Sequence, residues 1–406
     1  MESKRPDADI VASLAAAPRA HRGVCGSLLS AWRTETGGAL VVVSGDAGAG
    51  STATMLAALL AACGQSVVQA TAAHVHRWRE RVRCNGEAID PAALAAAIDA
   101  SGLEGEASSA EMLLAAAVAV ARDTGAETLI VEAPAQAPYW AQPTTCDRVI
   151  VATTSDAAWL MEHLPHAVAA TSEVVMAPQR ESVAEAVREA TANGGATLSE
   201  VATACRIGKV QAGRDSQRCT IQTPAGRYDL ALPLLGGHQR ANLATALLAA
   251  GAVDPKRAAK ALQALRLPLR LELLKRSPLV LADAADNAPS LRALERALPE
   301  ILERARLTVV ATVAADTPLE LLTETIGRLD AEVRVAFSAN ERAPADEAAR
   351  RLRKLGVGAQ LVGAPGPALQ AAIDGSGPRD AVLVVGSLRR TAEARAYLLG
   401  LEQDPV

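Results

Sequence analysis

The residues most able to do chemistry lie in "LVVVSGDAGAGSTATML", residues 40–56. A run of apolar β-branched residues leads into a turn that carries Gly45, Gly48 and Gly50, and an apolar helix pattern follows. Such turns bind phosphate because unpaired amides and the positive end of the helix dipole converge there. The general pattern is G-x4-G-K-[ST]. Gly45, Gly50 and Ser51 match it, but Ala49 stands where the lysine is expected.

Two hydroxyl residues follow this turn. Ser51 and Thr52 each offer an oxygen that a magnesium ion accepts as a ligand. An ordinary strand–turn–helix that uses glycine only for its geometry explains the same residues equally well. The motif alone therefore leaves two interpretations open, a nucleotide site and a plain turn.

The surrounding pattern predicts two α/β domains. Short apolar runs such as Leu40–Ser44 alternate with helical segments, which is typical of a mostly parallel sheet. Between 208 and 234 the residues alternate polar and apolar with turn signals, which predicts a small antiparallel patch. A new series of strands and helices begins after Leu267–Arg270. The expected divisions are an N-terminal segment at 1–35, a nucleotide-binding domain at 36–267 and a smaller domain at 268–406.

Composition narrows the range of partners. The 406 residues are too many for one compact core, which favours several domains. A net charge of -4 gives no support for a nucleic-acid or membrane partner. The six cysteines show no paired spacing, which indicates reduced thiols in a cytoplasmic protein. Every apolar stretch long enough to span a bilayer is interrupted by charges or turn residues, so we expect no membrane span.

Five further segments resemble the folylpolyglutamate synthase and dihydrofolate synthase family of the Mur ligase superfamily. "HVHRWRERVRCNGEAID" (74–90) is similar to the family's SPHL-x-x-F-x-ER-x-x-x-NGE segment, and "LPLLGGHQRANLATALLA" (232–249) to LPLLG-x-HQ-x-x-N. "PLRLELL", "LADAADNAPSLRAL" and "VLVVGSLRRTAEAR" resemble PGRLE, DGAHNP and GSL-x-x-x-x-E-x-R. The resemblance runs in order from about residue 36 to the C-terminus.

This resemblance implies a fold and a reaction. The fold class is α/β and Mur-ligase-like: a P-loop nucleotide-binding domain with a central, mostly parallel sheet, and a smaller Rossmann-like C-terminal domain. ATP, with Mg²⁺, phosphorylates a folate-type carboxylate, and the amine of glutamate then displaces the phosphate to form an amide. The site lies in the cleft between the domains, where closure excludes water.

The resemblance also assigns candidate roles. The catalytic candidates are Glu132, His74 and Asp283. The nucleotide-binding candidates are Gly45, Gly48, Gly50, Ser51, Thr52, Gln239, Asn242, Arg270 and Asn287. The substrate-binding candidates are Arg77, Arg81, Arg83 and Ser387, and the magnesium candidates are Ser51 and Glu132.

The arginines after His74 form a pattern of their own. Arg77, Arg79, Arg81 and Arg83 alternate along a segment that we expect to be extended, so one face would be cationic. That face suits a polycarboxylate such as a glutamyl tail. A solvated edge strand explains the same alternation.

Several family positions have changed. The loop lysine is Ala49, the DGAHN histidine is Asp286, and Asp46 adds a negative charge to the loop. The GLDH histidine is missing after the strand near 149–154. No lysine lies between Lys4 and Lys209, so the carbamylated lysine of the family is absent as well.

The lost charges favour one of three hypotheses. One lysine–phosphate pair at ~4 Å is worth at most about 4 kcal/mol at an effective dielectric near ~20, which is roughly three decades of affinity. Amides and a metal can replace that much binding, but the combined losses remove stabilisation of the transition state. We therefore expect a catalytically impaired homologue that keeps a ligand cleft for a folate or other polycarboxylate. The alternatives are an active ligase on an unusual substrate, and a nucleotide-sensing protein or partner of an active enzyme.

Overall fold

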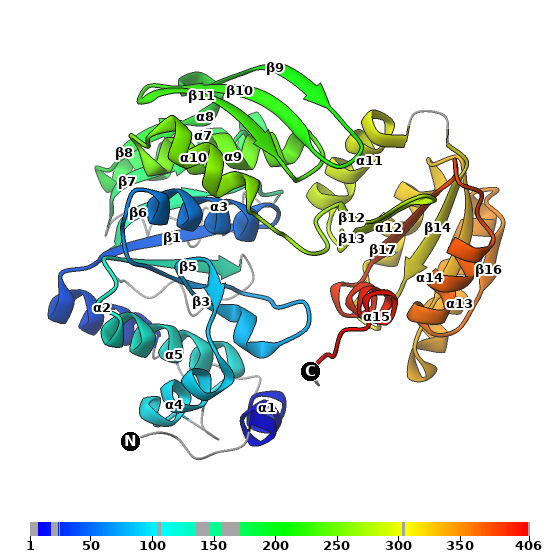
Figure 1. Ribbon diagram of the computed structural model, residues 1–406, viewed down its shortest axis with the longest axis horizontal. Coiled ribbons are helices and arrows are strands. Elements are labelled where there is room, and N and C mark those ends of the chain that lie inside the picture. Colours follow the sequence, from blue (N-terminus) through cyan, green and yellow to red (C-terminus); the bar gives the residue numbers. More distant parts are fainter. Residues whose placement is uncertain are drawn as a thin grey trace.

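The structure is a computed structural model that describes residues 7–17, 23, 25–103, 107–134, 146–155, 171–302 and 305–404. Two α/β units lie side by side in Figure 1, one blue to green and the other yellow to red. The predicted α/β class with parallel-rich sheets is confirmed. No described helix has the length and apolar character that crossing a membrane requires.

An eight-stranded sheet forms the centre of the first unit, in the order β4-β3-β2-β5-β1-β6-β7-β8. All neighbours pair in parallel except β2–β3 and β3–β4. Its strands are β1 Ala39–Gly45, β2 Val67–Ala70, β3 Val82–Cys84, β4 Glu87–Ala88, β5 Thr128–Pro134, β6 Cys146–Val151, β7 Thr171–Met176 and β8 Thr197–Glu200. The predicted apolar runs become central strands because both faces of this sheet are covered.

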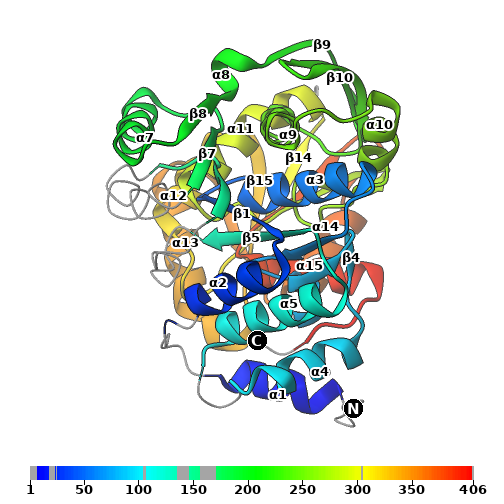
Figure 2. The same cartoon turned by 90° about the vertical axis from the view of Figure 1, so that its left-hand side faces the viewer.

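Helices cover both faces of this sheet (Figures 1 and 2). α1 (Asp7–Ala16), α2 (Cys25–Thr36), α4 (Pro91–Ser101) and α5 (Ser109–Asp123) share one apolar core with the sheet. α3 (Ala49–Ala62), α9 (Gly237–Ala250) and α10 (Pro255–Gln263) pack on the other face. α7 (Glu181–Gly194) and α8 (Val201–Ala204) flank β8 in sequence. The fully buried Trp32 of α2 shows that residues before 36 belong to this core.

The predicted antiparallel patch is confirmed. β9 (Arg206–Ala212), β10 (Gln217–Thr223) and β11 (Gly226–Leu232) form a separate sheet in the order β11-β10-β9. In Figure 1 this sheet lies over α9 and α10. Its residues Ile221 and Leu230 belong to the same apolar core as α3, α9 and α10.

The second unit has a six-stranded sheet in the order β12-β13-β17-β14-β15-β16, parallel except for β12–β13. Its strands are β12 Glu272–Arg276, β13 Leu279–Asp283, β14 Leu307–Thr312, β15 Ala331–Ala336, β16 Ala359–Leu361 and β17 Ala381–Gly386. Its helices are α11 Ala288–Leu302, α12 Leu319–Gly327, α13 Arg342–Lys354, α14 Pro365–Asp374 and α15 Leu388–Leu399. The chain enters this unit between α10 and β12, at the predicted "LPLR" segment, although the domain limits themselves stay a prediction.

Candidate functional site

The glycine loop lies between the carboxyl end of β1 and the start of α3. The amides of Asp46 and Ala47 both donate to the carbonyl of Thr153, at 3.0 Å, so the loop is held against the end of β6. Gly48 is the N-cap of α3 with a φ of 80°, and a Cβ there would lie 2.4 Å from Asn242 Oδ1. Only glycine satisfies both the left-handed backbone and this close approach.

A cleft of about 570 Å³ opens in front of this loop and is lined by both units. Ten of the predicted site residues line it: Gly45, Gly48, Gly50, Ser51, Glu132, Gln239, Asn242, Arg270, Asp283 and Asn287. The other candidates, Thr52, His74, Arg77, Arg81, Arg83 and Ser387, are not among its lining residues. Residues that are far apart in sequence thus converge on the carboxyl edge of the first sheet, as expected for an open α/β fold.

Glu132, at the end of β5, lies directly beneath the loop. Its carboxylate accepts the amide of Ala72 at 3.0 Å and the amide of Gly50. A Cβ on Gly50 would lie 3.0 Å from Glu132 Oε1. Burial raises the pKa of Glu132, while the Ala72 amide and the charge of Arg270 act in the opposite direction. The start of α3 therefore already holds a carboxylate from the protein itself.

Asp46 turns its charge away from the loop amides. Its Oδ2 accepts three hydrogen bonds, from Thr154 Oγ1 at 2.9 Å, from the Ser155 amide at 2.8 Å and from Ser155 Oγ at 2.9 Å. Its backbone carbonyl accepts Asn287 Nδ2 at 3.0 Å, which joins the loop to the second unit. Within the described part of the chain, hydroxyl and amide donors rather than cations satisfy this carboxylate.

Arg270 reaches the cleft from the connector between the two units. Leu269 and Leu271, on either side of it, have positive φ angles of 56° and 52°, and Leu269 occupies the family's glycine position. Asp283 Oδ2 accepts the Leu271 amide at 2.7 Å. Burial raises the pKa of Asp283 to about 7, against the opposing effect of the Arg270 charge. The charge of Arg270 thus acts on both Glu132 and Asp283, two buried acids of the cleft.

The predicted extended, cationic face between 77 and 83 is wrong. Glu80 accepts the amides of Val75 at 2.9 Å, His76 at 3.1 Å and Arg77 at 2.9 Å. These bonds fold Trp78–Arg81 into a 3-10 turn (η1), and strand β3 begins only at Val82. The alternation of side chains that a strand would produce is therefore lost.

The arginines of this segment have protein partners. Arg77 pairs with Asp404 at 3.1 Å and with Glu402 at 2.5 Å, so it holds the C-terminal residues. Arg81 lies 4.8 Å over the ring of Trp78, and Arg83 donates to the carbonyl of Gly86 at 3.1 Å. Their assignment to substrate stays a prediction, and it requires a ligand to compete with these contacts.

His74 is buried and neutral. Its Nδ1 accepts Arg81 Nε at 3.0 Å, and its ring lies 4.5 Å from that of Trp78. Burial, together with the charge of Arg81, lowers the pKa of His74 to about 3. The imidazole therefore acts as a hydrogen-bond acceptor for an arginine near neutral pH.

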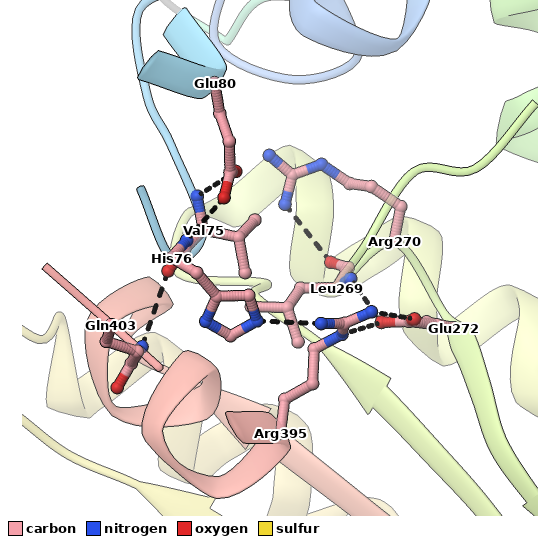
Figure 3. A network of polar contacts seen from close by, with 8 residues as sticks. All are labelled: Val75, His76, Glu80, Leu269, Arg270, Glu272, Arg395 and Gln403. Carbon is pink, nitrogen blue, oxygen red and sulfur yellow. Dashed lines mark hydrogen bonds and ion pairs between the residues drawn. The ribbon is translucent and has the colours of Figure 1, made fainter. Parts of the chain in front are cut away.

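A polar network joins this loop to the second unit (Figure 3). Arg395 of α15 makes two bonds to Glu272, at 2.7 and 2.8 Å, and one to His76 Nε2 at 2.7 Å. Gln403 and Asp404 bind the same loop through the carbonyls of Val75 and His76. Because Glu272 follows the connector, the network ties loop, connector and C-terminal helix together.

Comparison with known proteins supports the resemblance. No protein-family model matches the chain. A stretch of 196 residues is 30% identical to the folylpolyglutamate synthase of Lacticaseibacillus casei. This match covers 45% of the chain and 44% of that relative, less than half of its length.

The solved structures extend the likeness to nearly the whole chain. Mycobacterium tuberculosis folylpolyglutamate synthase complexed with ADP has a TM-score of 0.81 at 19% identity, over 93% of this chain and 95% of that one. The chain has the folylpolyglutamate synthase fold. The Thermotoga maritima folylpolyglutamate synthase gives 0.78 at 17% identity, over 97% and 96%. A folylpolyglutamate synthase complex with AMPPCP and folate gives 0.79 at 21%, over 98% and 100%. The predicted resemblance and the Mur-ligase-like fold are confirmed.

Three arginines and a histidine at the cleft were missed as site residues; burial lowers the pKa of that histidine, His238, to about 4, so it is neutral near pH 7. The lining of the cleft includes Arg180, His238, Arg292 and Arg296 in addition to the glycine loop and Arg270. Arg292 and Arg296 are four residues apart, a spacing that places both on one face of the helix after "DNAPS". Arg180 carries no such local signal. The described residues contain no group of three or more metal-ligating side chains.

Proposed function

We propose that this is a folylpolyglutamate synthase-like protein that keeps an anion-binding cleft but has little or no ligase activity. The observation that carries the proposal is the carboxylate of Glu132, which takes the Gly50 amide beside a loop whose lysine is Ala49. A transferring phosphoryl group needs positive charge at this point. Here a buried acid and a methyl group stand in its place.

The loop still suits an anion. Among the described residues, the amides of Gly48, Ala49 and Ser51 have no acceptor, and all three residues line the cleft. Related structures were solved with ADP or AMPPCP, so a nucleotide phosphate is the natural candidate. Gly48, Ala49 and Ser51 would hold it through their amides, and Arg270, which lines the same cleft, would supply a positive charge.

Magnesium does not fit these residues in the same way. Among the described residues Glu132 is the carboxylate beneath the loop, and it already accepts the amides of Ala72 and Gly50. The Ser51 hydroxyl is the second candidate ligand, and Ser51 is 97% buried. We therefore derive no catalytic step through a metal at this site.

An activity assay tests the proposal. Purified protein is mixed with ATP, Mg²⁺, glutamate and a panel of folates, and released phosphate is measured. We expect no release that depends on both glutamate and a folate. Turnover that requires both would overturn the loss of ligase activity, and the chain would then be an active ligase with rewired phosphate contacts.

Restoring the charge separates binding from catalysis. Ala49→Lys is expected to raise the affinity for ATP by up to about three decades, without creating ligase activity. Ala49→Met is the matched control, because it adds similar length but no charge. Equal ATP affinity in both variants would mean that the loop does not face a phosphate.

We place the protein in the cytoplasm, because its six cysteines are free thiols.

A further inference from the structure

Three arginines that line the cleft lie close enough for their charges to act on one another. Arg180 is the N-cap of α7 in the first unit, and Arg292 and Arg296 are one turn apart on α11 in the second. All three line the cleft, and α11 contacts α9, which carries Gln239 and Asn242. Figure 1 shows α11 where the two units meet. The two units thus bring their guanidinium groups to the same opening.

These arginines make no direct ion pair within the described part of the chain, although the charge of Arg296 helps to lower the pKa of its neighbour Glu295. No ion pair or side-chain hydrogen bond joins Arg180, Arg292 or Arg296 to a described residue. The neighbouring Glu295 pairs instead with Arg328 at 2.7 Å. Most other arginines are paired, as Arg188 is with Glu200 at 2.8 Å and Arg395 with Glu272 at 2.7 Å. An unpaired cluster costs stability, which a bound anion would recover.

The three charges act on one another. Burial and the charges of Arg180 and Arg296 lower the pKa of Arg292, and no acid opposes them. The acids of the cleft interact with a different cation: burial raises the pKa of Glu132, Asp283 and Asp286, and the charge of Arg270 opposes that rise in all three. The acids Glu132, Asp283 and Asp286 thus interact with Arg270, whereas the charges that act on Arg292 are those of two other arginines.

We infer that Arg180, Arg292 and Arg296 together bind a multivalent anion, an oligophosphate or a polycarboxylate, in the cleft. Guanidinium groups bind phosphate and carboxylate oxygens through paired hydrogen bonds. Several negative charges on adjacent groups match three converging cations better than a single charge does. The inference rests on the proposed anion-binding cleft. It assigns the positive charge that binds the anion to the arginines of α11 and α7 in place of the lost loop lysine.

Calorimetric titration of the full chain tests this site. Tripolyphosphate and propane-1,2,3-tricarboxylate are titrated separately, with no glutamate or folate present. We expect at least one of them to bind, and we expect Arg292→Gln and Arg296→Gln each to weaken it about 10-fold. Arg379→Gln is the matched control, because Arg379 is exposed and lies outside the cleft lining. Preference for tripolyphosphate or for the tricarboxylate identifies the source of the anion.

Three outcomes would overturn the inference: neither anion binds, the arginine variants bind as the wild type does, or Arg379→Gln loses as much affinity. The Tm of Arg292→Gln should not fall below that of the wild type, because the substitution removes repulsion, so lost binding would not reflect unfolding. The titration does not depend on ligation. Glutamate-dependent turnover would overturn the proposed loss of ligase activity and leave this result standing, and absent anion binding would overturn this inference and leave the loss of ligase activity standing.

Discussion

His74 offers a direct test of the electrostatics beside the cleft. In the folded protein its pKa is lowered to about 3 from 6.5, because the ring is buried and accepts a hydrogen bond from Arg81. A proton on His74 would remove that acceptor and place a second positive charge 3.0 Å from the guanidinium nitrogen. The unfolded chain therefore binds this proton more readily than the native protein.

The sign and size follow from linkage. The stabilising contribution is complete above the unfolded pKa of 6.5 and is lost as the pH falls toward the folded pKa of about 3. A pH of ~5 lies about 1.5 units below the unfolded pKa, so protonation of His74 stabilises the unfolded state by about 2 kcal/mol at that pH. His74→Gln keeps an oxygen acceptor for Arg81 but does not titrate. Between pH ~7 and ~5 the unfolding free energy of this variant should therefore fall by about 2 kcal/mol less than that of the wild type.

Urea denaturation followed by circular dichroism at both pH values measures this difference. NMR of the imidazole protons supplies an independent readout, in which the His74 ring should show no titration between pH ~7 and ~5. A midpoint near ~6.5, or an unchanged pH dependence in His74→Gln, would refute the reasoning. It would also restore His74 as a group able to transfer protons at neutral pH.

Three further predictions concern the connector and its neighbours. Leu269 is fully buried with a φ of 56°. Leu269→Gly should be at least as stable as Leu269→Ala, because glycine relieves about 1 kcal/mol of left-handed strain. A urea titration in which the alanine variant is clearly more stable than the glycine variant would contradict this. Asp283→Asn should raise the unfolding free energy at pH ~8 by up to about 4 kcal/mol. Because the pKa of Asp283 is raised to about 7, the wild-type protein loses stability as the pH rises from near 4 through 7, and the asparagine variant does not. An equal pH dependence of the unfolding free energy in both proteins would argue against this. Arg395→Met should destabilise the folded protein by about 3 kcal/mol, because it leaves Glu272 without its cation. Adding Glu272→Gln to this variant should recover part of the lost stability. Strictly additive effects of the two substitutions would show that the two side chains do not interact.

The sequence by itself determined the two α/β units. Apolar runs such as Leu40–Ser44 alternate with helical stretches, and that local pattern encodes central parallel strands wherever the rest of the chain lies. The antiparallel patch near 208–234 was equally readable from its alternation. The loss of the loop lysine at Ala49 is also a fact of sequence that no tertiary contact alters.

Tertiary structure decided which partners the charged side chains have. The alternating arginines predicted a strand, but Glu80 captures three consecutive amides and folds the segment into a turn. Glu132 reaches the Gly50 amide because β5 lies beside β1 in the sheet. Arg180 meets Arg292 only because the two units share a cleft. Local patterns encode helices and strands, whereas the partner of a charge depends on distances that only the packed chain defines.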